Sequence, residues 1–284
     1  MIEAFNCDAI QVINLDRSPA RWERISKHFN ESGYLYQRFR AVDGYNVIIQ
    51  NMNSRHSFTG LSLKDKNSTI DVNTDYAIYC DGDSGSSVAF VYKYHGFLGS
   101  KSLTAGEYGC WCSHFAIWQE ARKNKCSNII VVEDDVVVKQ NLTAKFEDFV
   151  ERVPAYDFFM MDPTFLFINK TDVGKNKDII SSNKGYVDER EDIVRIQKDW
   201  DFWGTSGYAM SANAIAKITD FAVVTHPIDT FLAHVASERL IMPYNLSVYM
   251  SSGGLLGLSN DASEICVMGR GFGWHSDLSN ACHP

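Results

Sequence analysis

The sequence predicts an α/β protein in which helices flank a mixed, Rossmann-like sheet, with residues 1–284 forming a single domain. The chain opens with a strand, a helix and a second strand, as an α/β sheet with right-handed crossovers begins. A short β-branched run at 128–132 is typical of a strand that is buried on both faces. The 284 residues are 45% hydrophobic and 22% charged, as in ordinary globular proteins, so the core needs no metal or disulfide to be stable.

Local signals define the first elements. Residues 10–15 form an apolar run with one polar break, which predicts a buried first strand. Ser18 is a candidate N-cap, Pro19 suits the first helical position, and Gly33 is a candidate helix end. A second strand is expected at 35–42. These signals together predict the first crossover of the sheet.

Residues 45–100 differ from the rest of the chain because they are polar and rich in Asn, Ser and Gly. Within them, only 76–80 and 88–94 resemble strands. We therefore expect a lid-like insertion built mostly of surface loops, and not a second domain. Such a segment should show low amide-exchange protection in the absence of ligand.

The remaining chain alternates between expected helices and strands. A capping box at Thr104–Glu107 begins a helix with an aromatic face. Further strands are expected at 156–161, 193–197, 206–210 and 246–249, and further helices at about 146–153, 212–221 and 227–240. Residues 164–192 are expected to be loop, and 251–284 an irregular, glycine-rich tail.

The charge of the chain excludes two classes of partner. The 35 acidic residues outnumber the 27 basic ones, and no run of Lys or Arg occurs. A nucleic-acid-binding protein is therefore disfavoured, and so is simple electrostatic docking on anionic lipid. No apolar run approaches the roughly 20 residues of a membrane-spanning helix.

The amino-terminus and the cysteines predict a cytoplasmic protein. Polar residues near the start, among them Glu3 and Asp8, occupy the place of a secretory signal's apolar stretch. The number of cysteines, seven, is odd, and no CxxC pair occurs. We therefore interpret the cysteines as small, buried, unpaired side chains. On that interpretation, the glycosylation sequons carry no meaning; they lie at Asn67, Asn141, Asn169 and Asn245.

The most specific chemical signal is the acidic triplet Glu133-Asp134-Asp135, which follows the apolar strand directly. Ligands of open α/β sheets bind beyond the carboxyl ends of strands. In an extended segment, Glu133 and Asp135 point to one side and Asp134 to the other. Two carboxylates on one side suit a hard cation such as Mn²⁺ or Mg²⁺. The alternative is a solvated acidic turn.

Two further positions are candidates for catalysis or binding. Asp229 follows Pro227 at a helix start, where the helix dipole favours an ionised carboxylate that could act as a general base. The plain alternative is a helix-start acid. His114, next to Ser113 on the aromatic helix, is either a hydrogen-bonded structural histidine or a phosphate contact. Other candidate contacts for a phosphate, anion or metal are Arg17, Arg21, Arg40, His226, His275 and His283, although Arg21 could simply be solvated.

Five segments in order resemble glycosyltransferase family 25, which includes lipopolysaccharide and collagen galactosyltransferases. They are VINLDRSPARWERI, RAVDG, LTAGEYGCWCSHFAIW, IIVVEDD, and WGTSGYAMSANAIAKI with HPID. The resemblance covers about 10–250, with 45–100 as a variable insert. It implies a GT-A type fold, a nucleotide-sugar donor, a divalent metal and inversion at the anomeric carbon. Ala105 stands where relatives often have Pro.

The resemblance also implies roles for individual residues. Glu133 and Asp135 match the metal ligands, and Asp229 matches the PID motif, to which we assign the general base. The positions implied in binding the nucleotide sugar are Asn14, Asp16, Arg17, Arg40, Asp43, Glu107, Ser113, His114, Asp134, Gly204, Thr205 and Gly207. Asp201 is the next carboxylate that we would consider as a base.

We therefore predict a metal-dependent inverting glycosyltransferase that uses Mn²⁺ or Mg²⁺ and moves a hexose, galactose above all, from a UDP-sugar. The predicted acceptor is a glycan such as lipopolysaccharide, and a peripheral contact with the membrane that bears it is compatible with the sequence. Two alternatives stay open: a metal-dependent phosphodiesterase or nucleotide-sugar hydrolase, and a non-catalytic relative that only binds the sugar nucleotide.

Overall fold

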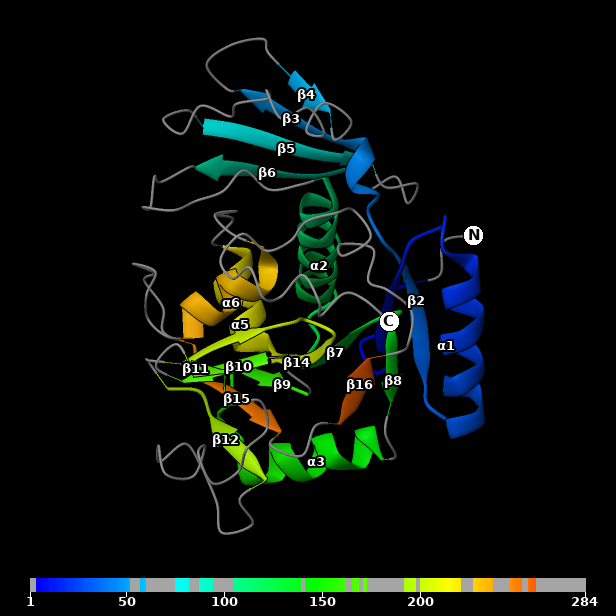
Figure 1. Ribbon diagram of the computed structural model, residues 1–284, viewed down its shortest axis with the longest axis vertical. Coiled ribbons are helices and arrows are strands. Elements are labelled where there is room, and N and C mark those ends of the chain that lie inside the picture. The colour runs from blue at the N-terminus through cyan, green and yellow to red at the C-terminus, as the bar shows by residue number, and fades with distance from the viewer. Residues whose placement is uncertain are drawn as a thin grey trace.

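Seven strands form the central sheet in the order β12-β15-β9-β14-β7-β1-β2 (Figure 1). The computed structural model describes residues 4–51, 57–59, 75–81, 87–93, 105–138, 141–161, 165–168, 171–172, 192–197, 200–220, 227–236, 246–251 and 255–258. The strands are β1 (Ile10–Asn14), β2 (Tyr36–Arg40), β7 (Asn128–Glu133), β9 (Phe158–Met160), β12 (Ile193–Arg195), β14 (Gly207–Ser211) and β15 (Val248–Ser251). β1 pairs in parallel with β2 and β7, whereas β14 runs antiparallel between β7 and β9. The predicted mixed α/β sheet is confirmed.

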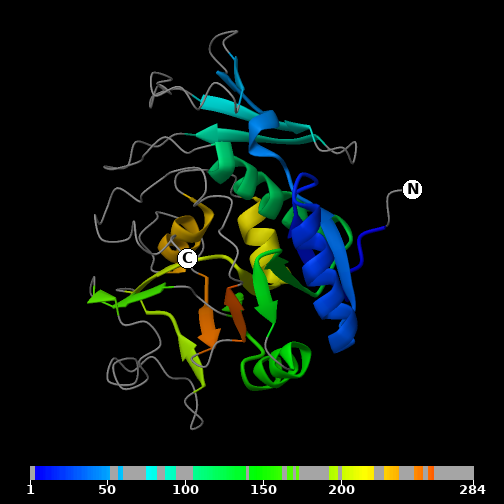
Figure 2. The ribbon, with the colours of Figure 1, turned by 45° about the vertical axis from the view of Figure 1, so that its right-hand side comes forward.

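Five helices in the described part of the chain cover the two faces of this sheet (Figures 1 and 2). They are α1 (Pro19–Ser32), α2 (Ala105–Lys123), α3 (Leu142–Arg152), α5 (Ala212–Thr219) and α6 (Ile228–Ala236). One core contains side chains from α2, α5 and α6, and the other contains side chains from α1 and α3. No helix among the described residues is long and apolar enough to cross a membrane.

The strands supply both cores by simple alternation. In β7, Ile129 and Val131 join the α2 core, while Val132 joins the α1 core on the opposite face. In β9, Phe158 and Phe159 divide in the same way. Each large apolar side chain that is fully buried contributes about 1.5–3 kcal/mol to folding. The apolar strand predicted at 128–132 is therefore buried on both faces, as expected.

The first helix begins and ends where the sequence indicates. Pro19 is its first residue, and Gly33 ends it in the left-handed conformation with φ of 71°. Ser18 occupies the N-cap position, but its side chain makes no capping hydrogen bond. The later helix α5 has a true cap, because the Ser211 hydroxyl accepts a hydrogen bond from the backbone N–H of Ala214 at 3.2 Å.

The region expected to be mostly loop contains a second sheet. After the short 3-10 helix η1 (Gly44–Asn46), four antiparallel strands pair in the order β4-β3-β5-β6. They are β3 (Val47–Asn51), β4 (Ser57–Thr59), β5 (Asp75–Asp81) and β6 (Ser87–Lys93). The strands predicted at 76–80 and 88–94 are confirmed, but β3 and β4 were not predicted because their short apolar runs lie in polar surroundings. Figures 1 and 2 show this sheet beyond the amino-terminal end of α2.

Two other expectations need correction. The expected loop at 164–192 contains β10 (Phe165–Ile168) and β11 (Thr171–Asp172), which form a sheet with β13 (Trp200–Trp203). The expected irregular tail contains β16 (Leu256–Leu258), which pairs with β8 (Val136–Val138). The pairings of β10 with β13 and of β16 with β8 join segments far apart in sequence, and local patterns do not show such partners. Residues 164, 169–170, 173–191, 252–254 and 259–284, and Thr104 of the predicted capping box, lie outside the described residues.

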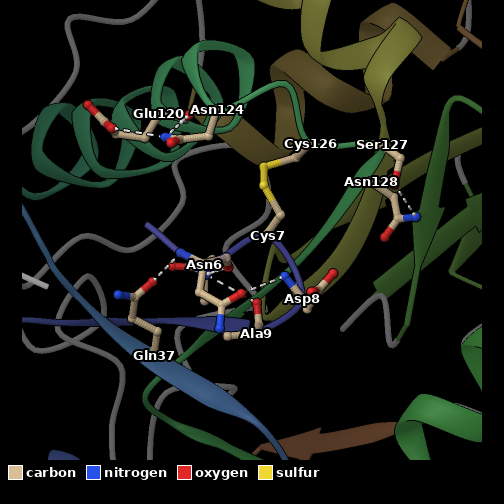
Figure 3. Close-up of a disulfide and its surroundings, with 11 residues drawn as sticks. Asn6, Cys7, Asp8, Ala9, Gln37, Glu120, Asn124, Cys126, Ser127 and Asn128 are labelled. Carbon is tan, nitrogen blue, oxygen red and sulfur yellow. Dashed lines mark hydrogen bonds between the residues drawn. A yellow bond between two sulfur atoms is a disulfide. The ribbon is translucent and has the colours of Figure 1, made fainter. Parts of the chain in front are cut away.

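A disulfide joins Cys7 to Cys126, so the prediction of seven unpaired cysteines is wrong (Figure 3). Their Cα atoms lie 5.3 Å apart although 119 residues separate them in sequence. Cys7 precedes β1 and Cys126 precedes β7, and these strands are parallel neighbours, so both cysteines lie at the same edge of the sheet. Spacing along the chain could not show this proximity. Disulfides are typical of oxidising compartments.

Candidate functional site

A cavity opens at the carboxyl ends of β1, β2 and β7, beside α2. This is the edge at which open α/β sheets bind ligands. Its walls are formed by Ile13, Leu15, Arg17, Arg21, Ala41, Val42, Gly44, Gly106, Gly109, Cys110, Ser113, His114, Glu133, Asp134 and Asp135. The whole acidic triplet thus lies where its position after the apolar strand indicates, together with the predicted Arg17, Ser113 and His114.

Glu133 faces α2 and the start of β14. The Thr205 hydroxyl donates a hydrogen bond to Glu133 Oε1 at 2.8 Å, and His114 Nε2 lies 3.5 Å from the same oxygen. Burial alone would raise the pKa of Glu133, but His114, Thr205 and Arg21 hold it below its ordinary value. Glu133 is therefore an anion at neutral pH.

Asp134 points the other way, toward β1 and α1. Its carboxylate accepts hydrogen bonds from Asn14 Nδ2 at 2.6 Å and from Arg21 at 3.2 Å. Arg24 donates to its backbone carbonyl at 2.9 Å, and Arg38 Nε donates to Asn14 Oδ1 at 2.8 Å. Burial raises the pKa of Asp134 despite Asn14 and Arg21. The structure thus bonds two predicted nucleotide contacts, Asn14 and Asp134, to each other.

Asp135 is the least satisfied of the three acids. Its Oδ1 is buried without a hydrogen-bond partner among the described residues, and its Oδ2 lies 4.0 Å from Arg21. Burial, then Glu133 and Asp134, raise the pKa of Asp135 to about 7. The triplet does not continue as an extended strand, because residues 134 and 135 form a turn. Asp135 and Glu133 nevertheless both face the cavity.

Helix α2 forms one wall of the cavity with buried polar side chains. The Ser113 hydroxyl donates to the Gly109 carbonyl at 2.7 Å and accepts from the Val42 backbone N–H at 2.9 Å. It therefore holds the loop after β2 against α2. Glu107 is also buried, but it does not line the cavity. Burial, followed by the charge of Glu133, raises the pKa of the Cys110 thiol well above its ordinary value, so the thiol is protonated at neutral pH.

Two glycines allow the loop and α2 to touch. A Cβ atom at Gly44 would lie 1.6 Å from the Ala105 carbonyl oxygen. A Cβ atom at Gly109 would lie 2.6 Å from the backbone nitrogen of Gly44. Side chains at either position would push η1 away from α2 and reshape the cavity. This contact explains the glycine of the RAVDG segment and the second glycine of GEYG.

At the rim, four predicted residues form two ion pairs. Arg17 pairs with Asp43, and its guanidinium lies 5.3 Å from the centre of the Tyr45 ring. Arg40 pairs with Asp16. Of the groups around Asp16, Arg40 contributes most to holding the pKa of Asp16 below its ordinary value. Arg17 lines the cavity, whereas the other three do not. Exposed pairs of this kind add little stability, about 0–1 kcal/mol each.

Asp229 lies in the first turn of α6 and anchors a backbone turn. Its Oδ2 accepts the Gly204 N–H at 3.1 Å, and its Oδ1 accepts the Thr230 N–H at 2.7 Å. Gly204 has φ of 96°, which favours glycine, and Thr205 follows with its bond to Glu133. Burial raises the pKa of Asp229, which differs from the expectation that the helix start alone sets its charge. Asp229 does not line the cavity.

Sequence reasoning named Arg21 as a candidate contact but missed two other residues that shape the site. Arg21 is not a solvated helix position, because its side chain is only 14% exposed and pairs with Asp134. Cys110 lines the cavity, and Tyr208 holds His114 from the neighbouring strand. Spacing could have suggested Cys110, which lies one helical turn before His114. Gly207 does not line the cavity. A Cβ atom at Gly207 would lie 2.0 Å from the Leu256 side chain.

Comparison with known proteins gives short stretches of similarity. Mouse procollagen galactosyltransferase 2 is 26% identical over 147 residues, which cover 51% of this chain and 22% of that protein. A glycosyltransferase 25 family member of Drosophila melanogaster is 26% identical over 129 residues, 45% of this chain and 16% of that protein. Human inactive glycosyltransferase 25 family member 3 is 38% identical over 55 residues, 19% of this chain and 9% of that protein. The matched part thus spans about a fifth or less of these relatives.

The sequence profile of glycosyltransferase family 25 (LPS biosynthesis protein) matches residues 8–232. The match includes the three strands β1, β2 and β7 and the helix α2 that form the cavity, the acidic triplet and Asp229. It confirms the family resemblance of the five ordered segments. The chain belongs to glycosyltransferase family 25.

Proposed function

We propose that this protein is a metal-dependent inverting glycosyltransferase that moves galactose from UDP-galactose to a hydroxyl group of an acceptor. Membership of the family supports a glycosyltransferase, and mouse procollagen galactosyltransferase 2 supports galactose. The observation that carries the proposal is the cavity with three adjacent acids, in which Asp135 keeps a buried carboxylate oxygen without a partner. Such an oxygen is costly unless a ligand completes it.

The residues at the cavity fit a divalent cation. Hard cations such as Mn²⁺ and Mg²⁺ prefer carboxylate oxygens, and Glu133 and Asp135 would hold one here. When bound, such a cation supplies positive charge that stabilises a departing diphosphate. Burial, and then the like charges of Glu133 and Asp134, raise the pKa of Asp135, and a cation would relieve that repulsion.

Other residues of the chain would bind the donor and move one proton. Arg17 and Arg21 line the same cavity, so their guanidinium groups can bind phosphate oxygens. The acceptor hydroxyl attacks the anomeric carbon on the face opposite the diphosphate, which leaves as UDP. We assign removal of the hydroxyl proton to Asp229, whose carboxylate has lone pairs beyond the two backbone hydrogen bonds that it accepts. Its raised pKa brings it nearer to neutrality, which suits a general base.

Two names bear on the acceptor. The family description names lipopolysaccharide biosynthesis, which supports a glycan acceptor, whereas the mouse relative's name points to procollagen. The cytoplasmic location expected from the sequence rested in part on unpaired cysteines. The Cys7–Cys126 disulfide favours an oxidising compartment instead.

A second candidate function is a protein that binds a sugar nucleotide without turnover. Its support is the 38% identity with human inactive glycosyltransferase 25 family member 3 over 55 residues. Such a protein would use the same cavity, and it would bind the donor but release no UDP.

Measurement of UDP release from a panel of UDP-sugars separates these functions. With Mn²⁺ present, we expect UDP release only when UDP-galactose and an acceptor are both supplied, and no release in the presence of a chelator. Donor binding without release would support the non-catalytic alternative. Equal release with and without acceptor would indicate a hydrolase. Full activity in chelator would contradict the metal requirement.

A further inference from the structure

Three side chains of different ligand types meet on the α2 wall of the cavity. The Cys110 sulfur, a ring nitrogen of His114 and a Glu133 carboxylate oxygen all lie within 4.8 Å of one another. Cys110 and His114 are four residues apart on α2 and therefore project from the same face of the helix. Glu133 is the last residue of β7. The three ligands thus stand on two regular elements with fixed positions.

The surrounding contacts leave one ring nitrogen of His114 without a hydrogen-bond partner among the described residues. Its side chain is fully buried, and its Nε2 has no hydrogen-bond partner among the described residues. The nearest acceptor, Glu133 Oε1, is 3.5 Å away, beyond ordinary hydrogen-bond length. Buried polar nitrogens nearly always have a partner, so a ligand between Nε2 and Glu133 would resolve the gap.

The outer contacts of the cluster are those of a metal-binding histidine. His114 Nδ1 lies 2.7 Å from the Tyr208 hydroxyl, which also accepts a hydrogen bond from Trp118 Nε1 at 2.9 Å. If Nδ1 donates to Tyr208, the Nε2 lone pair points toward Glu133 and Cys110. Thr205 orients Glu133 in turn through its 2.8 Å hydrogen bond. Metal-ligating histidines almost always have such an outer partner on the other nitrogen.

The charge and access of the site also suit a cation. The carboxylates of Glu133, Asp229, Glu107 and Asp135 all act electrostatically on the Cys110 sulfur. Arg21, which acts on Glu133, is bonded to Asp134. Cys110, His114 and Glu133 all line the cavity, so an ion can enter from solvent.

We propose that Cys110, His114 and Glu133 bind one divalent ion of the zinc class, with the remaining coordination position open to the cavity. A sulfur, nitrogen and oxygen ligand set favours Zn²⁺, whereas Mn²⁺ and Mg²⁺ prefer oxygen ligands alone. The site is therefore distinct from the carboxylate pair of Glu133 and Asp135, although both use Glu133. Its existence does not depend on the proposed transferase activity.

Cobalt titration of the full chain, prepared without a polyhistidine tag, tests this site. Co²⁺ substitutes for Zn²⁺ and gives a thiolate-to-metal absorption band when a cysteine is a ligand. Binding as a thiolate releases the Cys110 thiol proton to solvent. We expect one such band at one equivalent of Co²⁺, and we expect Zn²⁺ to displace it. Cys110→Ala should abolish the band. The matched control is Cys112→Ala, which removes a buried thiol of the same helix outside the cluster and should leave the band intact.

Two further variants separate the ligand roles. Tyr208→Phe removes the outer hydrogen bond to His114 and should weaken Co²⁺ binding by roughly 10–100-fold, the usual effect of losing such a partner. Asp135→Asn should leave the band unchanged, because Asp135 belongs to the oxygen site. In the wild-type protein, Zn²⁺ should slow alkylation of Cys110, measured by peptide mass mapping. Absence of the band in the wild type, its persistence in Cys110→Ala, or unprotected Cys110 would each overturn the proposal.

Discussion

The two sides of the cavity differ in how completely their polar groups are bonded. On the β1 side, Asp134 is bound by Asn14 and Arg21, and Arg38 in turn binds Asn14. The other side, which we call the α2 side, includes α2 and the turn after β7; here His114 Nε2 and Asp135 Oδ1 are buried without hydrogen-bond partners among the described residues. The bonded side stabilises the fold, whereas the unbonded side is where a ligand would lower the free energy most.

The bonded side extends along the whole β1–β7 pair. The Cys7–Cys126 disulfide joins the segments that precede the two strands. The hydrogen bond between Asn14 and Asp134 joins the last residue of β1 to the residue that follows β7. The parallel ladder between the strands is thus held at both edges of the sheet. We expect substitutions there to change stability, and substitutions on the α2 side to change binding and turnover.

The largest expected effect is that of Asp135→Asn on transfer. The change removes a proposed metal ligand and keeps the size of the side chain, so Mn²⁺-dependent UDP binding should weaken and transfer should be abolished. Isothermal titration with UDP and an assay of UDP release measure the two effects. Activity equal to the wild type would show that Asp135 is not a ligand.

Asp229→Asn should lower turnover by roughly 10²–10⁴-fold with little change in donor affinity, if Asp229 is the general base. Because the pKa of Asp229 is raised and the base must be ionised, wild-type turnover should fall as the pH drops through that raised value. Steady-state kinetics against pH check both expectations. A stability loss of about 1 kcal/mol with near-normal turnover would show that Asp229 anchors Gly204 and is not the general base.

The contribution of Asp135 to the stability of the metal-free protein should fall as the pH rises from about 4 to about 7. Asp135 has a folded pKa of about 7 against an ordinary value of 3.8, so its protonated form stabilises the folded state and ionisation removes that stability. The loss is at most about 4 kcal/mol, since one pKa unit corresponds to about 1.4 kcal/mol.

Denaturant unfolding of the wild type and of Asp135→Asn at several pH values measures this loss. The two proteins should converge at low pH and diverge at high pH, with the variant more stable. Added Mn²⁺ should restore wild-type stability at high pH, because it binds the folded state. Parallel pH profiles for the two proteins would contradict the assignment.

On the bonded side, replacing both Cys7 and Cys126 by Ser should lower the free energy of unfolding by about 2–4 kcal/mol. Under conditions in which both proteins are fully folded, UDP binding should change little, because the bond lies at the opposite edge of the sheet from the cavity. Thiol counting on the unfolded wild-type chain, before and after reduction, provides the direct check. At least two additional thiols should appear on reduction; an unchanged count would show that the bond does not form.

The smallest expected effect is that of Asn14→Ala, which leaves the buried Asp134 carboxylate with one partner fewer. We expect a stability loss of about 1–3 kcal/mol, measured by denaturant unfolding, with Co²⁺ binding unchanged. Asn14→Ala is also the sharpest test of the contrast between the two sides. If Asn14→Ala weakened Mn²⁺-dependent UDP binding more than Asp135→Asn does, the bonded side would be part of the ligand-binding site.

Local sequence patterns predicted those parts of the molecule that depend on neighbouring residues. Helix α1 ends at Gly33 because that position needs a left-handed backbone, and the alternation of β7 places the triplet at the edge of the sheet. Asp229 and His114 were candidates from their positions on predicted helices, and their roles stay predictions. The position of the triplet after the apolar strand agrees with the cavity at the carboxyl end of β7.

Long-range contacts explain what the sequence did not reveal. The pairing of β8 with β16 and the bond between Cys7 and Cys126 each join distant segments. Arg21 has the spacing of a solvated helix residue, and only the approach of β7 makes it a partner of Asp134. The unpartnered nitrogen of His114 likewise depends on the position of Tyr208 from another strand.

The contact between Gly44 and Gly109 has a mechanical consequence. Helix α2 and η1 meet there with no room for even one methyl group, and the small four-stranded sheet begins immediately after η1. On α2, Cys110 directly follows Gly109, and His114 lies about one turn further along the helix. A displacement of η1 would therefore shift this part of the cavity wall, so that movement of the small sheet would be transmitted to the face of α2 that carries Cys110 and His114.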